Sequence, residues 1–257
     1  MAEKTDDMPV MEHLEELRRV LVVSAIATLV LAIAAFFFID QILAILMEPL
    51  SRIEQHVSFL GITEPIFVKL KLSFFTGFLA AMPIILWQIW SFVVPALKKN
   101  ERVAFTTFVL VSFFCFIGGV AFAFFGVFRY GVHFLLQFAG PTLSPMLTID
   151  KYISFTISFL LPFGIVFELP LVSYFLARFE LISYAFLAKN RRYAILVSVV
   201  IAAVITPTPD IITCLIVSGP MYLLFEFSVF VVRITERRVA RRKKRRQMAE
   251  TADDQPQ

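Results

Sequence analysis

Six long stretches of apolar residues run through the sequence and limit the folds that it can adopt. Three of them contain no charged residue and cover residues 20–39, 72–97 and 103–128. A fourth, over residues 152–177, contains a single charged residue, Glu168. A bilayer hydrocarbon core about 30 Å thick needs roughly 20 helical residues to cross it. Each of these four stretches therefore predicts a transmembrane helix.

The last two apolar stretches are shorter. Residues 193–209 are uncharged, but Pro207 and Pro209 are expected to end this helix near Thr206. Residues 211–225 are also uncharged, and after Glu226 the chain stays uncharged to residue 232. We predict a fifth span at 193–206 and a sixth at 211–232. The uncharged part of each is shorter than the core is thick, so the bilayer must thin beside them or a partner must cover them.

Composition supports a membrane protein. The chain is 59% hydrophobic and 17% charged, whereas soluble domains carry about 25% charged residues. This excludes an ordinary cytosolic globule and a disordered chain, and no alternating pattern typical of a β-barrel is visible. No repeat or flexible linker divides the sequence. The prediction is an all-α polytopic membrane protein with six transmembrane helices in a single membrane domain, 1–257.

The basic residues predict the orientation of the chain. Of the 24 Lys and Arg, 19 fall in the N-terminus, loops 98–102 and 178–192, and the tail after Val232. An excess of basic residues marks the cytoplasmic side, so both termini are predicted to be cytoplasmic. The tail 233–257 is expected to bind anionic lipid headgroups and to be disordered beyond the membrane surface. It lacks the aromatic residues that would suggest nucleic-acid binding.

No pattern typical of an enzyme is present. The sequence lacks a nucleophile elbow, a zinc-protease motif, a phosphate-binding loop and a dinucleotide fingerprint. Its three His lie in separate loops or termini, and Cys115 and Cys214 lie in different spans. These residues predict neither a metal site nor a disulfide framework. We expect no enzyme, cofactor or metal.

Glu168 is the most informative polar residue because it lies inside a predicted span. A charge at this depth costs about 2.5–3.5 kcal/mol on insertion scales. Pro162 and Pro170 are expected to bend the same helix. Two interpretations remain open from the residues alone. Glu168 is either a protonated side chain packed in the bundle interior or a docking group in a polar, partly hydrated concavity.

A second acidic set lies on the predicted cytoplasmic face. Residues 9–19 predict a short amphipathic helix that leads into the first span, with Leu14 and Leu17 on one face and Glu16 largely on the other. Loop 98–102 contains one acid, Glu101, among three basic residues. On these residues alone, plain solvation or a local ion pair is a better interpretation than a binding role.

Six short segments, in this order, resemble the TatC family, the multispanning receptor subunit of the twin-arginine protein translocase. They are H-L-E-E-L-R at 13–18, M-E-P-L at 47–50, W-Q-I-W-S-F-V-V-P-A-L at 87–97 with Glu101 after it, F-E-L-P at 167–170, T-P-T-P-D-I at 206–211 and P-M-Y-L-L-F-E at 220–226. Each motif is weak alone, but their order and spacing over six spans are specific. The resemblance implies a cupped helical bundle in the bacterial cytoplasmic (inner) membrane.

The resemblance also implies roles for individual residues. Glu16 and Glu101 match the positions that face the paired arginines of the signal peptide, with Arg18, Phe92 and Pro95 at neighbouring positions. Glu168 matches the polar residue of the concave face. The positions linked to docking of a partner helix and to the periplasmic turn are Pro49, Thr206, Asp210, Thr213 and Glu226. Cys214 departs from the family because many relatives carry a polar residue, typically Gln, near this position, so Thr206 or Thr213 is expected to make that contact here.

The implied partners are twin-arginine signal peptides of folded precursors, single-span TatA/TatB-type subunits, further copies of the chain in the complex and the lipid bilayer, with no nucleic acid. The chemistry is compatible, because two adjacent guanidinium groups each suit a carboxylate that accepts two hydrogen bonds. The main alternative function is a secondary transporter or ion channel that uses Glu168 as an ion or proton site. That alternative predicts inverted repeats, and the sequence shows no symmetry between its two halves.

Overall fold

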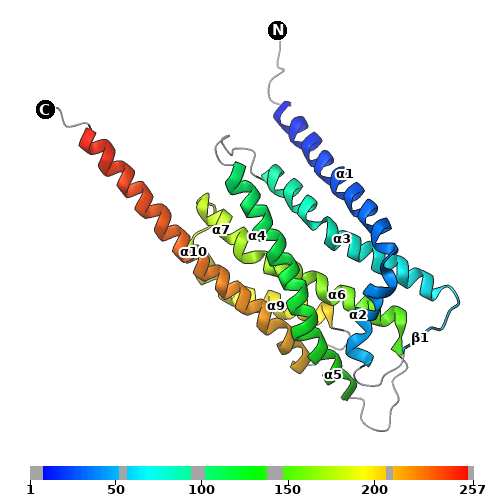
Figure 1. The fold of residues 1–257 in the computed structure, drawn as a ribbon. Helices are drawn as coiled ribbons and strands as arrows, with labels where there is room; N and C mark the ends of the chain where they lie inside the picture. The colour runs from blue at the N-terminus through cyan, green and yellow to red at the C-terminus, as the bar shows by residue number, and fades with distance from the viewer. Residues whose placement is uncertain (1–7, 52–56, 94–101, 138–146, 207–210, 254–257) are drawn as a thin grey trace. The chain divides into compact units, whose positions relative to one another are not determined.

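The computed structural model describes residues 8–51, 57–93, 102–137, 147–206 and 211–253, and almost all of these are helical (Figure 1). The first part of the chain forms α1 (Met8–Phe36), α2 (Ile39–Ser51), the short strand β1 (Val57–Ser58), α3 (Glu64–Val93) and α4 (Arg102–Ala121). A π-helical segment, Phe122–Phe128, leads into α5 (Arg129–Gln137). The remainder forms β2 (Leu147–Thr148), α6 (Ile149–Phe167), α7 (Leu169–Arg178), α8 (Tyr184–Lys189), α9 (Arg191–Ile205) and α10 (Ile211–Asp253).

Five stretches of helix within the described residues are long and apolar enough to cross a membrane. They cover Leu14–Phe36, Glu64–Phe92, Thr106–Phe134, Ile149–Arg178 and Ile211–Arg241. The polytopic helical architecture predicted from the sequence is confirmed. Helix α9 coincides with the predicted short fifth span, but its 15 residues reach only about 22 Å at 1.5 Å per residue. The sixth membrane crossing therefore stays a prediction.

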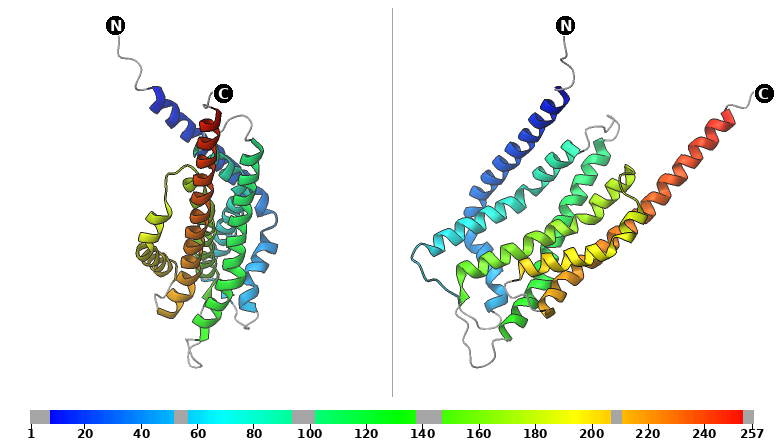
Figure 2. Two further views of the ribbon diagram at one scale, coloured as in Figure 1. Left: turned by 90° about the vertical axis from the view of Figure 1, so that its left-hand side faces the viewer. Right: turned by 180° about the vertical axis from the view of Figure 1, so that it is seen from behind.

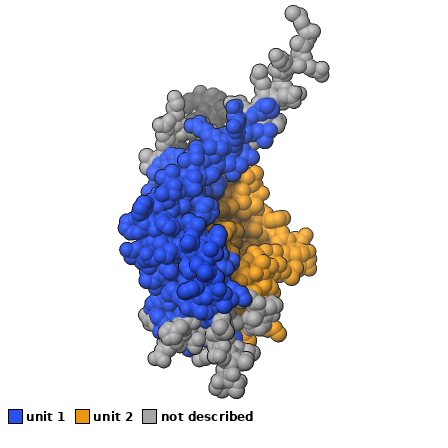
Figure 3. All heavy atoms as spheres, turned by 90° about the vertical axis from the view of Figure 1, so that its right-hand side faces the viewer, with its two compact units in different colours: residues 1–118, 128–158 blue, residues 119–127, 159–257 orange. Residues whose placement is uncertain are grey.

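The chain divides into two compact units, which Figure 3 distinguishes by colour. Unit 1 contains residues 1–118 and 128–158, and unit 2 contains residues 119–127 and 159–257. In unit 1, α1 lies along α3, and β1 pairs in parallel with β2 in the register Val57 to Leu147 and Ser58 to Thr148. In unit 2, α10 packs against α7 and α9. The single membrane domain expected for the whole chain stays a prediction.

The fourth span is interrupted where its prolines predict a bend. Helix α6 ends at Phe167 and α7 begins at Leu169, so Glu168 lies between them. The Glu168 N–H donates to the Ile165 carbonyl, three residues back, at 3.1 Å. Pro170 lacks the N–H that would continue the ladder. The chain therefore makes a three-residue turn at Glu168, which is tighter than a regular α-helical turn.

The expected disorder of the tail is wrong for most of its length. Helix α10 continues without interruption to Asp253, over 43 residues. Between Met221 and Asp253 the sequence has neither Gly nor Pro and is rich in Arg, Lys, Glu, Gln and Ala, which are good helix formers. Part of this extension also contacts α8, where the Tyr184 N–H donates to Glu236 at 3.3 Å and the Arg233 guanidinium lies 5.3 Å from the Tyr184 ring centre. A charged sequence is therefore no sign of disorder when helix propensity and packing both favour a helix.

Candidate functional site

Glu16 lies on the face of α1 that packs against α3. Counting in steps of four from Glu16 gives Val20, Ser24, Thr28 and Ala32, and this row is buried or half-buried along its length. Residues four apart share one face of a helix. Glu16 is half-buried, whereas its neighbours Glu15 and Leu17 are exposed. The structure therefore turns Glu16, and not Glu15, toward the body of unit 1.

The expected amphipathic segment 9–19 does not form a separate helix. It is the first part of α1, which runs unbroken from Met8 to Phe36. Leu14 and Leu17 are both exposed, so its apolar face is not the face that packs on α3. This arrangement suits a segment at a membrane surface, where exposed leucines meet lipid.

A close approach between two small residues holds α1 on α3. A Cβ atom added to Gly77 would lie 2.3 Å from the backbone nitrogen of Ala32, so no larger residue fits there without separating the helices. The two helices run in opposite directions (Figures 1 and 2). Glu16 lies about 24 Å before this crossing along α1, and Phe92 about 22 Å after it along α3, at 1.5 Å per residue. Glu16 and Phe92 are therefore brought to the same end of unit 1.

The start of α4 lies at this end as well. Phe78 of α3 contacts Phe116 of α4 with ring centres 6.5 Å apart, and Trp90 contacts Phe108 at 4.5 Å. The contacts move forward along α3 as they move back along α4, so these helices are antiparallel. Glu101 directly precedes the first residue of α4, Arg102. Glu101 and Pro95 themselves lie outside the described residues.

The remaining residues predicted for signal-peptide binding are also placed at this end. Arg18 is exposed on α1, and Phe92 is half-buried near the end of α3. The structure thus brings one predicted carboxylate, one arginine and one aromatic ring to the end of unit 1 at which α4 begins. Such a face can bind a cationic peptide segment.

Glu168 is buried in unit 2, with 9% of its surface exposed. Phe167, the residue before it, and Phe163 contact the ring of Phe122 with centres 5.5 and 6.4 Å apart. Gly119 packs so tightly here that an added Cβ would lie 2.7 Å from the Phe167 side chain. Phe122 is also the first residue of the π-helical segment Phe122–Phe128. Irregular helices of this kind are frequent at functional sites.

The polar residues at the α9–α10 turn face inward. Thr206 and Thr213 are 4% and 2% exposed. The Thr206 hydroxyl donates to the Ala202 carbonyl at 3.0 Å and lies 4.0 Å from the sulfur of Cys214. Asp210 lies outside the described residues. A contact of Thr206 or Thr213 with a partner helix stays a prediction, and it requires that their buried hydroxyls become accessible.

Glu226 is held within unit 2 by two side chains. The Arg191 guanidinium donates to one of its carboxylate oxygens at 2.9 Å, and the Tyr222 hydroxyl donates to the other at 2.7 Å. These contacts tie the first residue of α9 to the middle of α10. This arrangement gives Glu226 a role in holding α9 and α10 together. Its role in partner docking stays a prediction.

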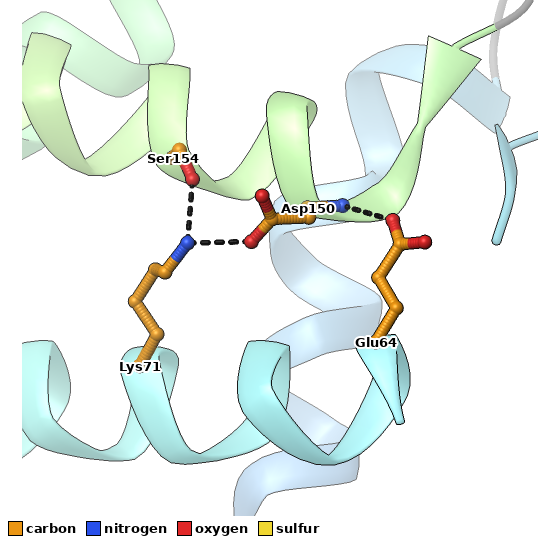
Figure 4. Close-up of polar contacts among 4 residues, drawn as sticks. All are labelled: Glu64, Lys71, Asp150 and Ser154. Carbon is orange, nitrogen blue, oxygen red and sulfur yellow. Dashed lines mark hydrogen bonds and ion pairs between the residues drawn. The ribbon is translucent and has the colours of Figure 1, made fainter. Parts of the chain in front are cut away.

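The sequence did not predict a polar network at the other end of unit 1, where Pro49 lies buried within α2. The Lys71 ammonium donates to the Asp150 carboxylate and to the Ser154 hydroxyl (Figure 4). One oxygen of Glu64 accepts from the Asp150 N–H at 3.2 Å, and the other accepts from the Leu60 N–H at 2.7 Å. The network joins α3 to the start of α6. Acidic and basic residues near the ends of different spans were its only signal in the sequence.

A family model described as the Sec-independent protein translocase protein (TatC) matches residues 12–220. Similar curated proteins include one named Sec-independent protein translocase protein TatC from Carboxydothermus hydrogenoformans. It is 46% identical over 226 residues, which cover 88% of this chain and 93% of that protein. The protein of the same name from Aquifex aeolicus is 38% identical over 90% of this chain and 97% of its own length.

Two solved structures are similar in fold and in sequence. One is described as the twin arginine translocase receptor TatC, with a TM-score of 0.79 and 38% identity over 87% of this chain and 99% of that chain. The other is described as the same receptor in DDM, with a TM-score of 0.78 and 40% identity over 85% and 98%. At these levels of identity and coverage, the likeness extends beyond the fold.

Proposed function

This chain belongs to the TatC family of Sec-independent protein translocase proteins, and we propose that it is the subunit that binds the twin-arginine signal peptides of folded precursors. We also propose that this chain nucleates the translocation complex with single-span TatA/TatB-type subunits. A solved relative is itself described as a twin arginine translocase receptor.

The position of Glu16 carries the proposal. Glu16 is on the packing face of α1, at the end of unit 1 where α3 ends and α4 begins. In the sequence, Glu101 directly precedes Arg102, the first residue of α4. Two carboxylates on separate elements suit two adjacent guanidinium groups, because each guanidinium can donate two parallel hydrogen bonds to one carboxylate. A lysine presents only a compact charge and would lose that geometry.

The location that fits this role is the bacterial cytoplasmic membrane, with both termini in the cytoplasm. The 19 basic residues in the two termini and in loops 98–102 and 178–192 support this orientation. It places Glu16, Arg18, Phe92, Pro95 and Glu101 where a precursor first arrives. Glu168 lies deeper, within the fourth span, and acts on an inserted signal peptide or a partner helix.

Site-specific photo-crosslinking tests the proposal. A photoreactive residue is introduced in turn over residues 12–19 and 95–102 of the full-length protein in membranes. We expect crosslinks to a twin-arginine precursor from both segments. The same precursor with two lysines in place of the arginines is the control and should crosslink much less. Equal crosslinking of the two precursors would contradict the proposal.

A further inference from the structure

At the end of unit 1 that carries β1 and β2, six large apolar side chains are exposed. They are Phe59, Leu60, Ile62, Ile66, Phe67 and Leu70. The first three belong to the loop between β1 and α3, and the others to the first two turns of α3 (Figure 1). Ile62 is 94% exposed. We call this group the interfacial shelf.

The length of α3 places the interfacial shelf at the edge of the hydrocarbon core. Its 30 residues extend about 45 Å, whereas the core is about 30 Å thick and the bilayer with its headgroups about 40–45 Å. The uncharged part of the helix begins only at Leu72. The turns before Leu72 therefore extend into the headgroup region. Apolar residues on a segment at this depth can lie among headgroups and the upper acyl chains.

The charges beside the interfacial shelf suit the same depth. Lys69 pairs with Asp40 at 2.7 Å, and Lys71 pairs with Asp150. Both lysines are partly exposed, and they lie on either side of Leu70 in the sequence. Lysine near a membrane surface keeps its stem on apolar surface and its ammonium among polar headgroups. Exposed apolar side chains interspersed with lysines are typical of a surface that lies in this zone.

Contacts within the protein hold the loop of the interfacial shelf in one conformation. Glu64 accepts hydrogen bonds from the backbone N–H groups of Leu60 at 2.7 Å and Gly61 at 3.3 Å. Its other carboxylate oxygen accepts from the Asp150 N–H, as Figure 4 shows. On the other side of the loop, β1 is paired with β2. Glu64 thus fixes exposed apolar residues in one position, which lowers the entropic cost of burying them.

We infer that the interfacial shelf inserts into the lipid headgroup region and anchors this end of unit 1 in the bilayer. The lipid is favoured as the occupant because the exposed surface is continuous with exposed Phe74, one turn further along α3 within the span. Glu64 acts as a positioning residue for the loop. This inference concerns the lipid surface and does not depend on binding of a signal peptide.

Fluorescence of an environment-sensitive probe tests the inference. Cys115→Ala and Cys214→Ala remove the two natural cysteines, and Ile62→Cys is then labelled in the purified full-length protein in phospholipid vesicles. We expect shallow insertion of about 5–10 Å, quenching by lipids spin-labelled near the headgroup, and roughly threefold weaker quenching by aqueous iodide than at a water-exposed site. Matched probes are Ser58→Cys on β1 and Arg238→Cys on α10, both exposed, and Phe114→Cys, exposed within a span.

The outcomes separate lipid from other occupants. The inference predicts shielding of the Ile62→Cys probe that is the same at low and high protein-to-lipid ratios. Adding Glu64→Ala should raise iodide quenching of this probe toward that of the Ser58→Cys probe. Equal iodide quenching at residues 58 and 62 in the parent protein would overturn the inference. Shielding that increases with the protein-to-lipid ratio would also overturn it, because a second copy of the chain would then be the occupant.

Discussion

Two neighbouring glutamates on α1 differ in direction although they share charge and size. Glu16 is half-buried on the face that packs against α3, and Glu15 is exposed. The sequence alone places both in one acidic segment. Only Glu16 lies in the row that continues through Val20 and Ala32 to the contact with Gly77.

This difference provides a matched pair of substitutions. We expect Glu16→Ala to weaken precursor binding roughly 10- to 100-fold, because it removes one charge-assisted contact worth on the order of 1.5–3 kcal/mol. Glu101→Ala should have a similar effect. Glu15→Ala removes the same charge from the exposed side and should bind a twin-arginine precursor almost normally. Binding is measured by co-purification or crosslinking at equal membrane levels of each variant. Equal losses for Glu15→Ala and Glu16→Ala would show that only net charge matters.

Glu168 is separated from the arginine contact by its depth in the fourth span. Glu168→Gln keeps hydrogen-bonding capacity at nearly the same volume and should retain substantial export. Glu168→Ala leaves a polar partner without its contact, at a cost of about 1–3 kcal/mol, and should impair export. Initial arginine-dependent binding should be preserved in both variants, as measured by the crosslinking described above. Loss of binding in Glu168→Ala as complete as in Glu101→Ala would mean that the two sites are one.

At the scale of elements, the crossing of α1 and α3 depends on one residue without a side chain. In membranes, small residues allow helix backbones to approach closely and gain packing contacts. An added Cβ at Gly77 would meet the backbone of Ala32, whereas one at Gly118 in α4 would meet nothing within 4 Å.

We therefore expect Gly77→Ala to destabilise the purified protein by about 1–3 kcal/mol through overpacking and to weaken precursor binding, because α1 carries Glu16. Gly118→Ala should be neutral or slightly stabilising, since alanine is the better helix former. Thermal unfolding in detergent, with the two variants side by side, measures the first effect. A Gly77→Ala protein as stable as the parent would show that α1 is not held at this crossing.

At the scale of the whole molecule, the number of membrane crossings decides on which side each terminus lies. In the part of the chain that the structure describes, five helical stretches are long enough to span, and α9 is a shorter sixth candidate. An even number of crossings places both termini on one side, whereas an odd number separates them.

Cysteine labelling distinguishes the two cases. In a background without Cys115 and Cys214, we expect Ala2→Cys and Gln257→Cys to resist a membrane-impermeant maleimide applied outside the cell, and Ser58→Cys to react. This pattern requires α9 to cross a locally thinned bilayer or to cross beside a partner, because it is several Å shorter than the core. Labelling of only one terminus would show that α9 does not cross. Reaction of all three sites after permeabilisation is the control.

The membrane class and the interruption of the fourth span can both be read from the sequence. These features depend on local quantities, namely hydrophobic length against bilayer thickness and the missing N–H of Pro170. The family resemblance was also readable from short motifs in order, and the family match confirms it. The helical course of α10 beyond Arg233 agrees with its residues, which have high helix propensity despite their charge.

Which side chains meet depends on the three-dimensional packing of the helices. Whether Glu16 or Glu15 faces α3 depends on how α1 is rotated on α3. The hydrogen bond from Lys71 to Asp150 joins residues 79 positions apart. The hydrogen bond from Arg191 to Glu226 joins residues 35 positions apart. Such contacts depend on the register between helices that are distant in the sequence, and hydrophobic periodicity within one helix does not specify that register. The exposed loop before α3 is likewise positioned by Glu64 and by the pairing of β1 with β2, which the sequence pattern did not reveal.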